Sequence, residues 1–210
     1  SPPLEVDYLI IGGGSAGCVL ADRLSESGKF EVLLLEAGPR DFSPFIHIPA
    51  GFLSLLNNPN LSWRYGSDPQ ASCNGRVIAY PQGKMLGGTG SLNGMLYVRS
   101  TRAEHLRWLE AGCQGWSFED VLPFYNKLEN INGEAPHKRM PVSSFVKQHD
   151  LSTAFLQACG QAGLTVRDTL NGDEREGAAA FHQNRQGRFR TGPAQTYLRH
   201  ARTRPNLQIK

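Results

Sequence analysis

The stretch Asp7-Tyr-Leu-Ile-Ile-Gly-Gly-Gly-Ser-Ala-Gly17 decides the class of fold. Its continuous apolar run, residues 7–11, is typical of a strand buried on both faces of a parallel sheet. The glycines break that run, and from Ser15 onward apolar residues recur at helical spacing. A second strand is expected at residues 30–35, with the apolar run at 32–35, and it ends at Glu36. Strand, helix and strand in this order predict the β-α-β unit of an α/β fold.

Residues 12–17 match the pattern G-x-G-x-x-G, placed between the expected strand and helix. Gly12 allows the tight turn, Gly14 lets the backbone approach a pyrophosphate, and Gly17 lets the helix lie close to the strand. Amide groups at the helix start can hold phosphates, and the carboxylate of Glu36 can accept hydrogen bonds from both hydroxyls of a ribose. The unit predicts a dinucleotide site without choosing between NAD and FAD. It argues against NADP, because a 2′-phosphate would meet a like charge.

A second glycine-rich segment spans residues 83–97. Its glycines remove side chains, so that backbone can touch a flat ligand, while Thr89 and Asn93 offer groups for hydrogen bonds. Such a loop would suit an isoalloxazine ring. Taken alone, it could equally be a glycine-rich surface turn.

Together the two segments resemble the glucose-methanol-choline (GMC) oxidoreductase family. A signature of that family has the form G-[RK]-x-L-G-G-[ST]-[SGT]-x-[LIVM]-N-x-x-x-[YFW], which residues 83–97 match. Similarity extends over nearly the whole chain, through Trp63-Arg-Tyr65 to Arg204-Pro-Asn-Leu207, and the chain is similar to choline-dehydrogenase-like bacterial members.

The resemblance implies a Rossmann-like FAD-binding domain, a parallel sheet with flanking helices, followed by the beginning of an α+β substrate domain. We expect the first part of the FAD-binding domain at residues 5–142, including a flavin-covering segment at 38–97. Residues 143–210 would start the substrate-domain segments and end on an unfinished strand, so that both domains are incomplete in this chain.

The resemblance also implies a flavin held without a covalent bond. Some members attach it through a His directly before the Asn of the signature, and that position here is Leu92. The implied FAD-binding residues are Gly12, Gly14, Ser15, Ala16 and Gly17 at the pyrophosphate, Glu36 at the adenosine ribose with its neighbour Ala37, and Met85, Gly88, Thr89, Asn93, Gly94, Met95 and Leu96 toward the flavin.

Members of the family oxidise an alcohol: a His base takes the hydroxyl proton as hydride leaves for the flavin N5. That base is expected beyond Lys210, so none of the six histidines is assigned a catalytic role (His47, His105, His137, His149, His182 and His200). The implied partners are a small-molecule alcohol, oxygen or a quinone- or dye-type electron acceptor, and the C-terminal part of the enzyme, on this chain or a separate one. Two alternatives remain open: a fatty-acid photodecarboxylase on the same fold, and a non-catalytic nucleotide-binding fragment.

Composition excludes several other classes of protein. With 210 residues, 40% hydrophobic and 20% charged, the chain should be globular. No apolar run is long enough to cross a membrane, and residues 1–6 do not form a signal peptide, while the initial Ser indicates trimming. Four isolated cysteines predict free, mostly buried thiols and no metal site. We expect a cytoplasmic protein, with a membrane-associated or organellar location as the alternative if a targeting segment has been removed.

Charge gives little sign of a nucleic-acid partner. The net charge is +3, and residues 167–210 hold nine Lys and Arg against four Asp and Glu, which is typical of a solvated face. Residues 185–190 interleave basic and aromatic side chains. We interpret them as a solvated turn or a loop over the substrate entrance, rather than as an RNA contact.

Local signals place the remaining elements. Thr101 and Ser117 begin capping boxes and predict helices at 102–111 and 118–129. Asp150 is expected to cap a third helix at 151–162. The last predicted elements are a loose hairpin of 178–183 with 188–189, a short helix at 196–202 and the start of a strand at 206–210.

Overall fold

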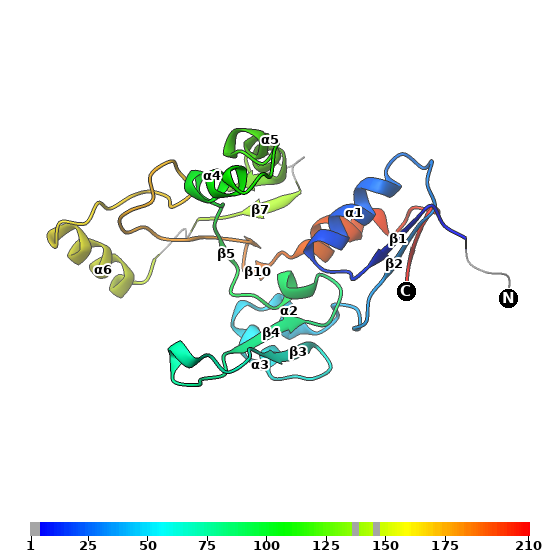
Figure 1. Cartoon of the computed structure of the whole chain (residues 1–210), viewed down its shortest axis with the longest axis horizontal. Helices are drawn as coiled ribbons and strands as arrows, with labels where there is room; N and C mark the ends of the chain where they lie inside the picture. Colours follow the sequence, from blue (N-terminus) through cyan, green and yellow to red (C-terminus); the bar gives the residue numbers. More distant parts are fainter. Residues whose placement is uncertain (1–4, 136–138, 145–147) are drawn as a thin grey trace. The chain divides into compact units, whose positions relative to one another are not determined.

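A computed structural model describes residues 5–135, 139–144 and 148–210 (Figure 1). The chain divides into two compact units. Unit 1 comprises residues 1–95 together with 185–210, and unit 2 comprises residues 96–184. The boundary expected at residue 142 lies inside unit 2. Residues 185–210 return to the unit that begins the chain, because their last strand pairs within its sheet.

The centre of unit 1 is a parallel sheet with the strand order β1-β2-β11. Its strands are β1 (Tyr8–Ile11), β2 (Val32–Leu35) and β11 (Leu207–Ile209). Figure 1 shows the red β11 close to the blue β1–β2 pair. Val32, Leu33 and Leu34 of the central strand are all buried, as its unbroken apolar run predicts. The predicted strand near the end of the chain is confirmed.

Helix α1 (Ser15–Ser25) connects β1 to β2 and completes the predicted β-α-β unit. Its buried residues recur at helical spacing and include Cys18 and Ala21. This face packs against the π-helical turn η4 (Ala194–Leu198) and the short helix α7 (Arg199–Ala201). These two elements stand where a single short helix is expected.

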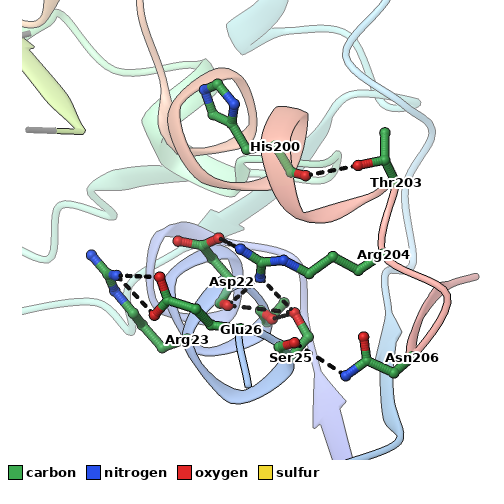
Figure 2. A network of polar contacts seen from close by, with 9 residues as sticks. Asp22, Arg23, Ser25, Glu26, His200, Thr203, Arg204 and Asn206 are labelled. Carbon is green, nitrogen blue, oxygen red and sulfur yellow. Dashed lines mark hydrogen bonds and ion pairs between the residues drawn. The ribbon is translucent and has the colours of Figure 1, made fainter. Parts of the chain in front are cut away.

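A polar network attaches α1 to the segment that precedes β11 (Figure 2). Asp22 is completely buried, and its Oδ1 lies 3.0 Å from Arg204 Nη2. Arg204 Nη1 also donates to the Asp22 carbonyl at 2.5 Å and to Ser25 Oγ at 2.8 Å. Asn206 Nδ2 donates to the carbonyls of Ser25 at 3.1 Å and Phe30 at 2.8 Å. The network therefore fixes the point at which the third strand enters the sheet.

Residues 38–82, which carry no periodicity in sequence, contain short regular elements. They are α2 (Pro44–His47), η1 (Pro49–Gly51), α3 (Phe52–Leu56), β3 (Ser62–Gly66), η2 (Ala71–Cys73) and β4 (Ala79–Gly83). The strands β3 and β4 form an antiparallel hairpin. One buried cluster joins residues 38–82 to the second glycine-rich segment. It consists of Ile46, Leu55, Met85 and Leu92.

Unit 2 contains three helices of two turns or more and four short strands among its described residues. They are β5 (Leu96–Tyr97), α4 (Arg102–Glu110), α5 (Phe118–Leu128), β6 (Glu129–Ile131), β7 (Met140–Val142), α6 (Asp150–Gln161) and β8 (His182–Gln183). Both predicted capping boxes are present, at Thr101 with Glu104 and at Ser117 with Asp120. In the described residues no helix is long and apolar enough to span a membrane.

Two local predictions are wrong. The third helix is capped by His149, whose Nδ1 accepts the Leu151 N–H at 3.1 Å, and Asp150 is its first residue. The hairpin is shorter than expected: β9 (Arg185–Gln186) pairs with β10 (Phe189–Arg190), while β8 pairs with β5. The tight turn lies between Gln186 and Phe189, where Gly187 has a φ of +59°, and Gln183 is paired with Leu96 instead.

Buried polar contacts fix the backbone around β5. The Tyr97 hydroxyl donates to Glu129 Oε1 at 2.5 Å, and Arg99 Nε donates to the same oxygen at 2.7 Å. Asn171 Oδ1 accepts the Arg99 N–H at 2.8 Å. Burial, followed by the hydrogen bond to Glu129, raises the pKa of Tyr97 above its usual range. The first residues of unit 2 are therefore anchored to β6 and to the loop at Asn171.

Candidate functional site

The two glycine-rich segments lie against each other in unit 1. We call residues 12–17 the first glycine loop and residues 83–97 the second glycine loop. The Gly87 N–H donates to the Gly13 carbonyl at 2.7 Å. A Cβ atom added to Gly88 would lie only 2.7 Å from the Gly14 Cα, and Gly88 has a φ of +53°. This close approach therefore requires glycine at position 88.

The meeting loops line a pocket of about 550 Å³. Its wall brings together seven of the predicted site residues: Gly12, Gly14, Ser15, Ala16, Gly17, Gly88 and Thr89. The other lining residues, Ile10, Ile11, Leu20, Gln82 and Gly83, are not among the predicted site residues. A pocket of this size is within the range of small-molecule sites.

One wall of the pocket is the beginning of α1. The first N–H groups of a helix have no partner within the helix, and this end carries the positive end of the dipole. In α1, which lies wholly within the described residues, the first turn holds no acidic side chain. A Cβ atom on Gly17 would lie 2.0 Å from the Gly12 carbonyl oxygen, so glycine allows the turn to fold onto the helix start. The wall is chemically suited to an anion such as a phosphate.

Glu36 is held beside the first glycine loop. Its Oε2 accepts the Gly13 N–H at 2.7 Å, and its Oε1 accepts the Gly38 N–H at 2.9 Å. A carboxylate oxygen can accept a second hydrogen bond, so both oxygens retain capacity for a ligand hydroxyl. The neighbouring Ala37 is exposed.

Thr89 and Gln82 form a polar pair in the pocket wall. Thr89 Oγ1 accepts the Gly83 N–H at 3.1 Å and donates to Gln82 Oε1 at 2.8 Å. The hydroxyl is thus occupied by the protein, and it orients the Gln82 amide. Gln82 reaches this place through the β3–β4 register, in which it pairs with Trp63. No motif in the sequence marks this position.

Predicted residues later in the second glycine loop lie in three different environments. Met85 and Met95 are buried, so their side chains offer almost no surface to a ligand. Asn93 and Gly94 are exposed. Leu96 belongs to unit 2, where it lines a separate, mostly apolar pocket of about 1060 Å³ beside α6.

Asn93 is held by a residue that the sequence motifs do not mark. Its Oδ1 accepts from the Met95 N–H at 3.0 Å and from Arg190 Nη1 at 2.8 Å. Arg190 is only 3% exposed, so this residue is not part of a solvated turn, whereas residues 186–189 beside it are exposed. Burial lowers the pKa of Arg190 to about 10. The sequence shows basic side chains in this segment, but not which of them is buried.

The histidines are dispersed, and His137 lies outside the described residues. His105 is buried, with Nε2 2.6 Å from Ser100 Oγ and Nδ1 2.8 Å from the Trp116 carbonyl. No group of three His, Cys, Asp or Glu side chains in the described part of the chain could hold a metal ion.

All four cysteines are free. Cys18 and Cys159 are buried, Cys73 is half-buried and Cys113 is exposed. The prediction of free thiols is confirmed, but only two of the four are buried.

Comparisons with known proteins identify the family of the chain. A family model described as GMC oxidoreductase matches residues 6–210. An oxygen-dependent choline dehydrogenase from Photobacterium profundum is 38% identical over 211 residues, which are 97% of this chain and 37% of that protein. The chain thus spans well under half the length of the curated relatives it matches.

Solved structures share the same fold. Pyridoxine 4-oxidase from Mesorbium loti superposes with a TM-score of 0.91 at 30% identity, covering 98% of this chain and 42% of that one. An FAD-dependent oxidoreductase from Chaetomium thermophilum superposes with a TM-score of 0.87 at 25% identity, covering 98% of this chain and 38% of that one. With its β-α-β unit, two meeting glycine loops and a family match over almost its entire length, the chain belongs to the GMC oxidoreductase family.

Proposed function

We propose that this chain supplies the FAD-binding part and the start of the substrate part of an enzyme that oxidises a small-molecule alcohol. The observation that carries the proposal is the contact between the two glycine loops, which line one pocket. The first loop offers main-chain donors for phosphates. The second comes close enough to the first for one extended ligand to contact both.

The chemistry of the residues at and beside the pocket supports FAD as its ligand. We assign the pyrophosphate to Gly12, Gly14, Ser15, Ala16 and Gly17, because the start of α1 presents N–H groups there without an acidic side chain. We assign the adenosine ribose to Glu36, whose carboxylate is already oriented by two backbone N–H groups. These hydrogen bonds hold the carboxylate beside the first glycine loop.

The second glycine loop would hold the flavin side. Gly88 and Thr89 line the pocket, and Asn93 and Gly94 are exposed beyond it. Leu92 is 1% exposed and has no nucleophilic atom, which favours a flavin bound without a covalent link at this position. Met85 and Met95 support the loop from the core.

Bound FAD would supply a two-electron acceptor for the hydride that leaves the alcohol carbon. The part played by this chain is to bind the pyrophosphate, to fix the ribose and to keep the second glycine loop in place. We assign the proton-accepting base to the part of the enzyme outside residues 1–210. Oxygen is the proposed final electron acceptor, with a quinone- or dye-type acceptor as the alternative.

The test uses the complete enzyme. This means residues 1–210 together with the C-terminal part, whether that part lies on the same chain or on a separate one. We expect denaturation to release FAD, and we expect small alcohols to bleach the flavin absorbance under anaerobic conditions, with recovery when oxygen is admitted. A complete protein that never retains FAD would contradict the proposal. Light-dependent release of CO₂ from a fatty acid would replace alcohol oxidation with photodecarboxylation.

The role of Glu36 can be tested separately. Glu36→Gln should weaken FAD binding by about tenfold, because the neutral amide accepts hydrogen bonds from ribose hydroxyls less strongly than the carboxylate does. Glu26→Gln is the matched control, since Glu26 is an exposed carboxylate at the end of α1. Titration of apoprotein with FAD, followed by flavin fluorescence, measures the change. Equal affinities for the two variants would contradict the ribose assignment.

A further inference from the structure

Arg190 carries a buried positive charge beside the second glycine loop. The residue is 3% exposed and lies on β10 of unit 1. Its Nε donates to the Ile46 carbonyl at 2.9 Å, and its Nη1 donates to Asn93 Oδ1 at 2.8 Å, with the Gly90 carbonyl at 3.5 Å. One guanidinium therefore connects α2 to both ends of the segment 90–93.

Among the residues that the structure describes, no acidic side chain is hydrogen-bonded or ion-paired with Arg190. Every hydrogen-bond acceptor of its guanidinium is a neutral carbonyl or amide oxygen. Its Nη2 is buried and has no hydrogen-bond partner among the described residues. Burying an unpaired cation costs several kcal/mol, and buried Arg is normally paired with a carboxylate. A neutral amide side chain could donate similar hydrogen bonds without the free-energy cost of burying a charge.

Burial is the cause of the lowered pKa of Arg190, about 10, and the group still carries its proton at neutral pH. The cation is therefore present under working conditions. It contacts Asn93, a residue that we assign to the flavin side of the site.

We propose that Arg190 is a positioning residue that also sets the charge of the flavin site: it orients Asn93 and favours the reduced, more negative form of the bound flavin. The inference rests on the proposed function. A hydride brings two electrons and one proton to the flavin, so the ring gains one negative charge while the alcohol becomes a carbonyl compound and gives its hydroxyl proton to a base. A nearby cation that is itself shielded from solvent, as Arg190 is, stabilises that added charge.

The experiment measures the midpoint potential of the flavin in the complete, FAD-loaded protein against a reference dye. Arg190→Met should reduce the preference for the reduced flavin by about tenfold, which for a two-electron couple is a fall of about 30 mV. Arg190→Lys keeps the charge and should stay near the wild-type potential. Arg188→Met is the matched control, because Arg188 is exposed on the same hairpin and loses the same charge.

A second variant covers the case in which Arg190→Met does not fold. Asn93→Asp keeps the shape of the side chain and the oxygen that accepts from Met95 and Arg190, and gives the guanidinium a carboxylate partner. The buried charge is then neutralised without a cavity. We expect the potential to fall by an amount similar to that in Arg190→Met.

Three results would overturn the inference. The first is an FAD-loaded Arg190→Met or Asn93→Asp protein with the wild-type potential, even if its melting temperature is lower, because a merely structural role predicts that outcome. The second is an equal fall in Arg190→Lys, which would show that charge is not the cause. The third is a wild-type protein without flavin, which overturns the proposed function as well and is thereby distinguished from the other two.

Discussion

Gly14 and Gly88 touch each other, yet a methyl group would meet different surroundings at the two positions. At Gly14 the nearest atom to an added Cβ is the Gly88 Cα, 4.0 Å away, and the φ of −73° suits any residue. At Gly88 the added Cβ would lie 2.7 Å from the Gly14 Cα, at a φ of +53°. The first methyl group therefore enters the pocket, whereas the second collides with backbone.

This contrast predicts two separable phenotypes. Gly14→Ala should leave the melting temperature of the complete apoprotein nearly unchanged and weaken FAD binding by about tenfold or more, because the methyl group occupies space needed by the pyrophosphate. Gly88→Ala should weaken binding and also cost roughly 1–3 kcal/mol of stability, through strain and collision. Thermal unfolding of apoprotein and FAD titration distinguish them. If Gly14→Ala binds FAD with the wild-type affinity, the assignment of Gly14 to the pyrophosphate site is contradicted.

The buried thiol of Cys18 should make the stability of the protein depend on pH. Burial raises the pKa of its thiol to about 12, whereas an unfolded thiol titrates near 9. Above pH 9 the unfolded state binds fewer protons than the folded state, so stability should fall as pH rises, by up to about 1.4 kcal/mol per pH unit from this group. Below pH 9 Cys18 should contribute no slope.

Denaturant unfolding of the complete protein at pH 8 to 10 in about half-unit steps measures this effect. Cys18→Ala should flatten the alkaline slope. Cys113→Ala, at an exposed thiol, should keep the wild-type slope. If both variants show the same slope as the wild type, the buried thiol is not the group that titrates.

At the scale of elements, an ion pair with a completely buried carboxylate takes part in the attachment of β11 to α1. Asp22 is completely buried, and Arg204 reaches it from the segment just before β11 (Figure 2). Arg204→Ala should destabilise the complete protein by about 3–5 kcal/mol, because it leaves a buried carboxylate without its cation. Chemical denaturation measures the loss. Arg202→Ala is the control, since Arg202 is an exposed arginine nearby.

The double variant Asp22→Asn with Arg204→Met tests the cause. Removing both charges should restore much of the lost stability, because neither charge is then left buried alone. If the double variant is as unstable as Arg204→Ala, the hydrogen bonds of Arg204 to Ser25 and to the Asp22 carbonyl, rather than the charges, stabilise the junction.

At the scale of the whole molecule, strand β1 of the parallel sheet has apolar side chains that are exposed. In β1, Leu9 is 53% exposed, although parallel sheets are normally buried on both faces. Ile11, which is 77% exposed, lies in the pocket wall and is accounted for there. The Photobacterium relative is much longer, since the aligned region is 37% of it. We expect further chain of the enzyme to cover β1.

Leu9→Asn in the complete protein tests this expectation. If β1 is covered there, the substitution should cost about 2–4 kcal/mol, as for a polar group placed in a core. Leu151→Asn, at a 73% exposed position of α6, gives the comparison in unit 2. A change within about 0.5 kcal/mol for Leu9→Asn would show that β1 remains open to solvent.

The sequence by itself determined the elements whose causes are local. An apolar run, a glycine turn and a helical pattern specify β1, α1 and β2, because each depends on residues only a few positions apart. The capping boxes at Thr101 and Ser117 are local in the same sense, since each joins residues three positions apart. Both glycine loops were recognisable because their backbone tolerates few other residues at these turns.

Only the tertiary structure decided which side chains those elements bury or bring together. The burial of Arg190 depends on contacts with Ile46 and Asn93, 144 and 97 positions away. Met85 lies in the core because α2 and α3 pack on it, and Gln82 enters the pocket through hairpin register. Side-chain burial and pairing over such separations follow from the packing of the whole unit, and local propensity contains no information about it.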